Sequence, residues 1–207
     1  MTTDTVGGVW VYSMELCRAL EKHGTEIHLA AMGAWPSEEQ QKEVAALKNV
    51  TLYKSDFKLE WMKDPWEDVE KAKKWITSIY HTVRPDLVHF NNYAQIENFW
   101  DCPIVTVFHS CVQTWWQAVK GTTAPSHWNR YKELVKDSLQ ESDVVVSPTR
   151  AILQEAKDTH HFTSETSVIN NGREVCFSEE KQKENFILCM GRLWDEGKNL
   201  KLLSSIA

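Results

Sequence analysis

The chain has 207 residues, of which 42% are hydrophobic and 25% are charged, the balance of a globular protein. A formal net charge of −6 and the lack of a basic stripe argue against nucleic acid as a partner. No apolar run approaches the roughly 18 residues of a membrane-spanning helix, and the first residues lack the pattern of a signal peptide.

Cysteine and histidine usage bears on location and on metals. The five cysteines include no C-x-x-C pair, and three of them lie in apolar or helical stretches. We interpret them as reduced thiols of a cytoplasmic protein. No cysteine or carboxylate stands at ligand spacing from His160 and His161, so we expect a solvated loop there and no metal site.

Short apolar runs alternate with amphipathic stretches in chain order. The runs are rich in β-branched residues and suit strands that are buried on both faces of a parallel sheet. We predict strands over residues 26–32, 50–53, 87–90, 104–108, 144–146, 167–169 and 186–190. Only three residues precede the first loop, where a full strand is expected. The alternation predicts right-handed βαβ units and a doubly wound, Rossmann-like α/β fold.

Capping signals predict where the helices begin and end. The first helix covers residues 9–23 and ends at Gly24. Asp64 is expected to cap a helix that has Pro65 in its first turn and stops at about residue 83, before Arg84-Pro85. Ser126 is expected to cap a further helix that reaches residue 142.

The end of the chain differs in composition. Residues 177–185 (FSEEKQKEN) carry seven charged or amide side chains and predict a linker. We therefore expect an acceptor-side domain over residues 1–176, a linker over 177–185, and the first βα unit of a second domain over 186–207. One βα unit cannot bury its apolar face alone, so it can pack on the first domain, pair with another chain or stay without fixed structure. Of these we expect pairing with another chain.

Ligands of open α/β sheets bind beyond the carboxyl ends of the strands, and two junctions there could approach a ligand closely. Gly7 and Gly8 precede the first helix, where backbone amides attract an anion, although a Gly-Gly pair can also serve only as a turn. His109 follows the strand at 104–108, where it is either a binding group or a histidine satisfied by neighbouring backbone.

Two further junctions carry cations. Ser147 and Pro148 are expected to open a helix whose first turn contains Arg150, a cation placed against the helix dipole. Arg192 and Lys198 flank a strand-to-helix turn, where a guanidinium fork and an ammonium can bind a diphosphate. The alternative is a surface turn balanced by Asp195 and Glu196.

Six segments, in order, resemble family 4 glycosyltransferases, which have the GT-B fold. These are residues 4–9 with the following helix, 85–89, 105–109, 144–147, 169–172, and the Gly-Arg-Leu and Lys-Asn-Leu elements of 191–200. Asn170 stands where the family usually has proline, and Gly197 where a bulkier residue is usual. The family's paired-glutamate motif would lie beyond Ala207, so the resemblance implies a truncated donor domain and a chain that is inactive alone.

The resemblance implies transfer of a sugar from a nucleotide-sugar to a glycan, lipid-linked or small-molecule acceptor with retained configuration. Arg192 and Lys198 would stabilise the leaving diphosphate in place of a metal ion, and no cofactor is implied. His109 would orient the sugar, the loop at Gly7 and Gly8 would lie against substrate, and Trp115 could stack on the acceptor or only pack.

Two other functions stay open at this point. The chain could be a non-catalytic or truncated subunit that binds acceptor only. It could also be another GT-B enzyme, such as a nucleotide-sugar epimerase.

Overall fold

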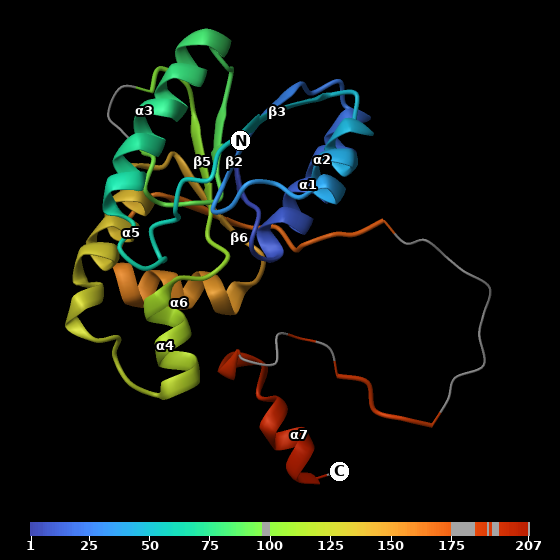
Figure 1. Ribbon diagram of the computed structural model, residues 1–207. Helices are drawn as coiled ribbons and strands as arrows, with labels where there is room; N and C mark the ends of the chain where they lie inside the picture. Colours follow the sequence, from blue (N-terminus) through green and yellow to red (C-terminus); the bar gives the residue numbers. More distant parts are fainter. Residues whose placement is uncertain (97–99, 175–184, 190, 192–194, 207) are drawn as a thin grey trace.

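In the computed structural model, parallel strands form the centre of the molecule and helices lie on both faces (Figure 1). The structure describes residues 1–96, 100–174, 185–189, 191 and 195–206. The strands are β1 (Thr2–Asp4), β2 (Ile27–Met32), β3 (Val50–Lys54), β4 (Val88–Phe90), β5 (Ile104–Val107), β6 (Val144–Ser147) and β7 (Glu165–Val168). The helices are α1 (Gly8–Glu21), α2 (Glu38–Ala45), α3 (Trp66–Val83), α4 (Val112–Lys120), α5 (Asn129–Glu141), α6 (Arg150–His160) and α7 (Leu200–Ile206), with 3-10 turns η1 (Ser126–Trp128) and η2 (Glu196–Lys198).

Two parallel ladders, β1-β2-β3 and β4-β5-β6-β7, meet at β1 and β4. Asn91, directly after β4, joins them: its backbone N donates to Thr2 Oγ1 (2.9 Å) and its Nδ2 donates to the Thr2 carbonyl (2.8 Å). The strand order is therefore β3-β2-β1-β4-β5-β6-β7. The strands stay parallel, but successive strands are added in opposite directions on the two sides of the boundary between β1 and β4. This boundary is the switch point where doubly wound sheets bind ligands.

The alternation of β2 shows why helices cover both faces. Ile27, Leu29 and Ala31 pack with α1 and α2, whereas Ala30 and Met32 pack with α3, β4 and β5. Both sets are buried. A strand that is apolar on both sides must be covered on both sides, as the sequence predicts for a parallel sheet. A third cluster joins β5 and β6 to α5 and α6 around the buried Phe108 and Val145.

Six of the predicted strands are confirmed to within about two residues, and the doubly wound parallel fold is confirmed. The first strand has only three residues, Thr2–Asp4. It pairs in register with Ala30–Met32, and all three of its residues are buried. The strand predicted over 186–190 is wrong for its described part, residues 186–189, which form no ladder. Met190 lies outside the described residues.

Helix starts differ from prediction by one to three residues. Pro65, with no side-chain cap bond, is the N-cap of α3, and Asp64 precedes it with a positive φ of 47°. Ser126 opens η1, and Trp128 is the N-cap of α5. Arg84, at φ 51°, ends α3 before Pro85, as predicted. The misplaced starts share one cause: short turns precede the helices, and hydrogen-bonding residues in such turns resemble caps.

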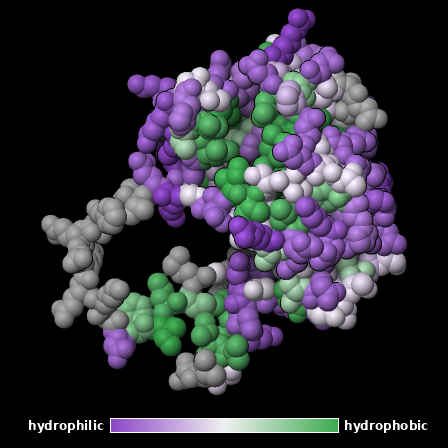
Figure 2. Space-filling view, turned by 180° about the vertical axis from the view of Figure 1, so that it is seen from behind, coloured by the Kyte–Doolittle hydropathy of each residue, from purple (hydrophilic) through white to green (hydrophobic). Residues whose placement is uncertain are grey.

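The described tail contacts the domain through η2 and α4. Lys120 of α4 pairs with Glu196, and the Gly197 backbone lies against the Trp115 ring, so that a Cβ there would be 3.0 Å from Trp115 Nε1. Glycine at position 197 therefore permits this contact. By contrast, Phe186, Ile187 and Leu188 are 63%, 84% and 70% exposed, and Figure 2 shows apolar atoms of the tail apart from the domain.

Candidate functional site

The loop after β1 is built around a buried carboxylate. Asp4 Oδ1 accepts hydrogen bonds from the amides of Val6 (3.0 Å) and Gly7 (2.7 Å), which bends the chain into α1. Gly7 is the N-cap, has extended backbone and carries no side-chain cap, while Gly8 is exposed at the first turn. An added Cβ at Gly7 would stand 3.4 Å from the Asp4 carboxylate. The two glycines thus leave the start of α1 free of side-chain atoms of their own.

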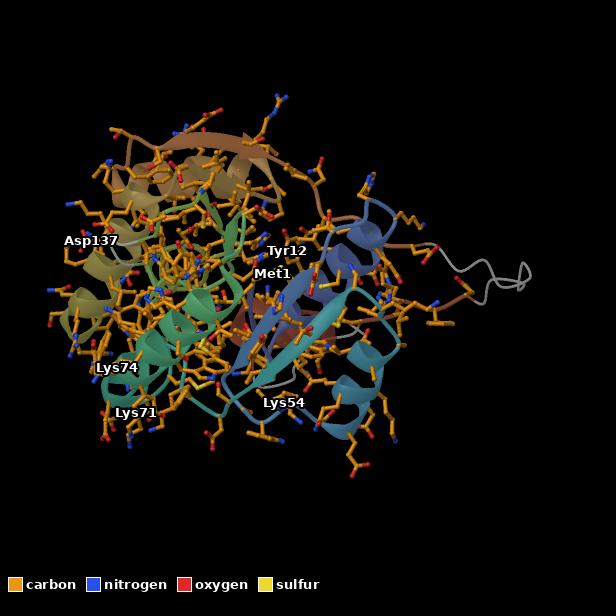
Figure 3. All side chains as sticks on the ribbon, turned by 90° about the horizontal axis from the view of Figure 1, so that it is seen from above. Met1, Tyr12, Lys54, Lys71, Lys74 and Asp137 are labelled. Atoms are coloured by element: carbon orange, nitrogen blue, oxygen red, sulfur yellow. The ribbon has the colours of Figure 1, made fainter. Side chains whose placement is uncertain are left out.

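His109 follows β5 and lies at the same edge of the sheet. Its Nε2 is 2.9 Å from Asn91 Oδ1, and the ring of Tyr12, from the second turn of α1, packs edge-on at 4.7 Å between centroids. His89 Nε2 also approaches Asn91 Oδ1, at 3.3 Å. Figure 3 shows Tyr12 at the centre of the molecule, where α1 meets the strands. The structure therefore brings α1, β4 and β5 together around His109.

Both imidazoles of this cluster are neutral at physiological pH. Burial lowers the pKa of His109 to about 4. Burial, followed by repulsion from the Met1 ammonium, lowers the pKa of His89 to about 3. A neutral imidazole can exchange hydrogen bonds with hydroxyl groups, but it offers no charge to a phosphate.

A buried acid supports the same edge from the loop between β3 and α3. Glu60 is 2% exposed, and its Oε1 accepts from the Tyr93 amide (3.0 Å) directly after β4. Desolvation raises the pKa of Glu60, and the nearby Asp4 carboxylate adds to this effect. Tyr93 Oη in turn donates to the Ser110 carbonyl (2.9 Å), beside His109. Glu60 thereby helps to hold the loops after β4 and β5.

The other predicted site residues fall into two groups. Ser147 is buried, and its Oγ donates to the Phe108 carbonyl (3.1 Å), so it links β5 to β6 and does not cap α6. The cap is Thr149, whose side chain accepts from Ile152 N. Arg150 is the first residue of α6, as expected, and is exposed.

The remaining predicted residues belong to α4 and the tail. Trp115 is half-buried on α4, 6.0 Å from the Trp116 ring centroid, and touches Gly197. Lys198 ends η2 and is exposed, and its side chain lies beside Gly191. Arg192 lies outside the described residues. The tail, which contacts α4 through η2, is thus a separate region from the sheet edge around His109.

Sequence reasoning missed Asn91, His89, Tyr12 and Glu60. His89 stands in the segment 85–89 that carried a resemblance, but only strand order brings β4 beside β1. Tyr12 lies within the helix predicted over residues 9–23, but its contact with His109 depends on how that helix packs on the sheet. Glu60 gives no signal at all, because a lone glutamate between elements is normally exposed.

Histidine and cysteine positions require a correction. His160 is buried at the end of α6, with Nε2 3.3 Å from Cys111 Sγ, so the predicted solvated loop is wrong at that residue. Burial lowers the pKa of His160 to about 4 and raises that of Cys111. Among the described cysteines none is in a disulfide, and Cys189 is exposed while Cys17 and Cys111 are buried.

The Gly7-Gly8 loop and His109 lie outside two cavities of the molecule. Two cavities of about 400 and 350 Å³ occur in the described part of the molecule, and Gly7, Gly8 and His109 line neither of them. One lies between α3 and α5, and the other at the amino-terminal ends of β2 and β4. Within the described residues, no helix combines the length and apolarity needed to cross a bilayer.

A parallel sheet whose strand order reverses between β1 and β4, with helices on both faces, defines a Rossmann-like α/β domain. Residues 6–175 match the family model described as Glycosyltransferase Family 4, and the chain belongs to this family. No curated protein sequence matches the chain.

Solved structures of glycosyltransferases share the fold. A sucrose-phosphate synthase from Thermosynechococcus elongatus is similar over 83% of this chain and 88% of that chain, with a TM-score of 0.54 and 14% identity. A UGT protein of Glycyrrhiza uralensis, solved with glycyrrhetinic acid 3-O-monoglucuronide, is similar over 82% of this chain, with a TM-score of 0.52 and 9% identity. The chain spans about half of that plant protein, at 48%. At such identities the likeness shows the GT-B type of fold alone.

Proposed function

We propose that this chain is the acceptor-side part of a retaining glycosyltransferase, which moves a sugar from a nucleotide-sugar to an acceptor. The supporting observation is the convergence of the Gly7-Gly8 loop and His109 at the switch point of a Glycosyltransferase Family 4 sheet. Ligands of such sheets bind outside the carboxyl ends of the strands, at the point where strand order reverses.

The proposed roles follow from charge. His109, neutral and half-buried, suits the orientation of sugar hydroxyl groups. The exposed start of α1 at Gly8 offers backbone amides to substrate. Arg192 and Lys198 would stabilise the negative charge that grows on the leaving diphosphate, and the proposal uses these cations in place of a metal ion.

The remaining predicted residues take weaker roles in the proposal. Arg150, exposed at the first turn of α6, can attract an anionic part of substrate. Ser147 acts through its bond to the Phe108 carbonyl, which fixes the residue before His109. Trp115 can stack on an acceptor only where its ring is not covered by Gly197. A cytoplasmic location belongs to the same proposal, and the free thiols Cys17 and Cys111 support it.

A transfer assay tests the proposal. The chain is joined to the donor-binding half of a Glycosyltransferase Family 4 enzyme, because the chain alone is expected to be inactive. The joined protein is incubated with UDP-, GDP- and ADP-sugars and a panel of glycan, lipid-linked and small-molecule acceptors. Release of nucleoside diphosphate that depends on acceptor, with a product of unchanged anomeric configuration by NMR, is the expected result. A product of inverted configuration would contradict the retaining mechanism.

The same assay separates the two alternatives. Acceptor binding by calorimetry without transfer, with every donor, would indicate a subunit that binds acceptor only. A donor sugar with altered ring stereochemistry and no acceptor product would indicate a nucleotide-sugar epimerase. Both results would overturn the assignment of transferase activity to this chain.

A further inference from the structure

Asn91 is the only described side chain that bonds both histidines of the edge. It is 6% exposed, and its Oδ1 lies 2.9 Å from His109 Nε2 and 3.3 Å from His89 Nε2. The two rings come from neighbouring strands, β5 and β4. One oxygen therefore sets the hydrogen-bonding state of both rings.

The amide of Asn91 can face in one direction only. Its Nδ2 lies 2.8 Å from the Thr2 carbonyl, which can only accept a hydrogen bond. A flipped amide would place two oxygens against each other at this distance. The Asn91 backbone amide is also fixed, by Thr2 Oγ1 at 2.9 Å. The oxygen of the side chain must therefore point toward the histidines.

An amide oxygen accepts and cannot donate, so each histidine must carry its proton on Nε2. A neutral imidazole has one N–H, which leaves Nδ1 of His109 unprotonated. The surroundings agree with neutrality. Among the described residues no carboxylate pairs with either ring. The groups that face them are the Tyr12 ring and, near His89, the Met1 amino group, whose own pKa is lowered by burial to about 6.

We propose that Asn91 is a positioning residue that holds His109 as the neutral Nε2–H tautomer, so that Nδ1 accepts a hydrogen bond from a sugar hydroxyl. Within the described structure, Nδ1 of His109 has no hydrogen-bond partner, and His109 is half-buried at the sheet edge. The identity of the ligand as a sugar rests on the proposed function, whereas the tautomer rests on the geometry alone.

The tautomer determines which chemical groups of a ligand His109 can bind. A hydroxyl group can donate to Nδ1, but an ionised phosphate oxygen is an acceptor and would face a lone pair. His109 therefore selects the sugar, and the diphosphate must be bound by cations elsewhere. In this proposal His109 therefore does not stabilise the leaving group.

Histidine-labelled protein tests the tautomer by long-range ¹H–¹⁵N NMR, with the His109→Gln variant assigning the signal. We expect protonated Nε2 and unprotonated Nδ1 at His109 from about pH 6 to about pH 8, with no titration in that range. A His109 that carries its proton on Nδ1, or that titrates within that range, would overturn the proposal.

Asn91→Ala is the matched perturbation. Without the Oδ1 acceptor, His109 loses the bond that holds its proton on Nε2, so a population with the proton on Nδ1 should appear. Asn170→Ala is the control, because Asn170 also follows a strand and donates to a backbone carbonyl, that of Pro148 (2.8 Å). It removes the same side-chain amide at a position that bonds no histidine in the described structure, and the His109 signals should not move. Equal shifts in both variants would contradict a specific role for Asn91.

The proposed hydrogen bond from a sugar hydroxyl to His109 Nδ1 is tested by adding methyl α-glucoside, UDP-glucose and inorganic phosphate separately to the labelled wild-type protein. We expect Nδ1 of His109 to shift with the two sugars and not with phosphate. A shift with phosphate, or no shift with any probe, would overturn the role as hydroxyl acceptor. The result of the tautomer measurement does not depend on these binding results, and the transfer assay tests the proposed function separately.

Discussion

Two apolar runs of the chain, residues 104–107 and 186–189, lie in opposite surroundings. The first forms β5 between β4 and β6, with Ile104 and Val107 buried. The second forms no ladder, and Ile187 is 84% exposed. Both runs are short and apolar, so the difference comes from their neighbours. A strand forms where flanking strands satisfy its amides and helices cover its faces.

The largest expected effect tests this contrast with one substitution in each region. Phe108→Ala should lower the free energy of unfolding by about 3–5 kcal/mol, because its fully buried ring packs against Tyr93. Phe186→Ala should change it by less than about 0.5 kcal/mol, because that side chain is 63% exposed. Urea denaturation measures both. Similar losses in the two variants would contradict the burial difference.

The second effect concerns pH at the edge site. The pKa values of His109 and His89, about 4 and about 3, lie below the ordinary 6.5, so the unfolded chain binds protons first. Their contribution to stability is complete above about pH 6.5 and is lost as the pH falls toward these values. His109→Gln should flatten this acid slope by up to about 1.4 kcal/mol per pH unit, measured by urea denaturation. An unchanged slope would mean that His109 is protonated in the folded protein.

A third effect concerns association through the tail. We expect the exposed Phe186, Ile187 and Leu188 to pair between chains, giving a mass that rises with concentration in light scattering. Removing residues 185–207 should leave a folded domain and reduce the oligomers. A monomeric full-length chain with an ordered tail would show instead that the tail docks only on its own α4, as η2 does.

The smallest effect concerns that docking contact. Lys120 and Glu196 are a partly exposed ion pair between α4 and η2. Glu196→Gln should lower the melting temperature only slightly, and added salt should reduce the difference from wild type. Thermal unfolding at low and high salt checks this. A larger, salt-independent loss would show that the tail is an integral part of the domain.

Most of the sheet could be predicted from sequence because strands such as β2 and β5 are short, mainly apolar runs, separated by amphipathic helices with clear ends such as Arg84-Pro85. His109 could be placed at the carboxyl ends of the strands because it follows a predicted strand, and the glycine loop because it stands where a strand before the first helix is expected. Asn91 and Tyr12 could not be paired with His109, since their contacts depend on β4 lying beside β1. The strand predicted over 186–190 failed because apolarity gives no information about partners.

The central claim is that the edge around His109 is the active edge of a glycosyltransferase, and one comparison of rates tests it most directly. With the donor and acceptor that give transfer, His109→Ala should lower kcat/KM about 100-fold, because the sugar loses its orientation. His28→Ala is the control, since His28 is also half-buried but lies at the opposite end of the sheet and bonds Tyr53 (3.0 Å). It should keep nearly full activity. Equal activity of the His109→Ala variant and the wild-type protein would contradict the account.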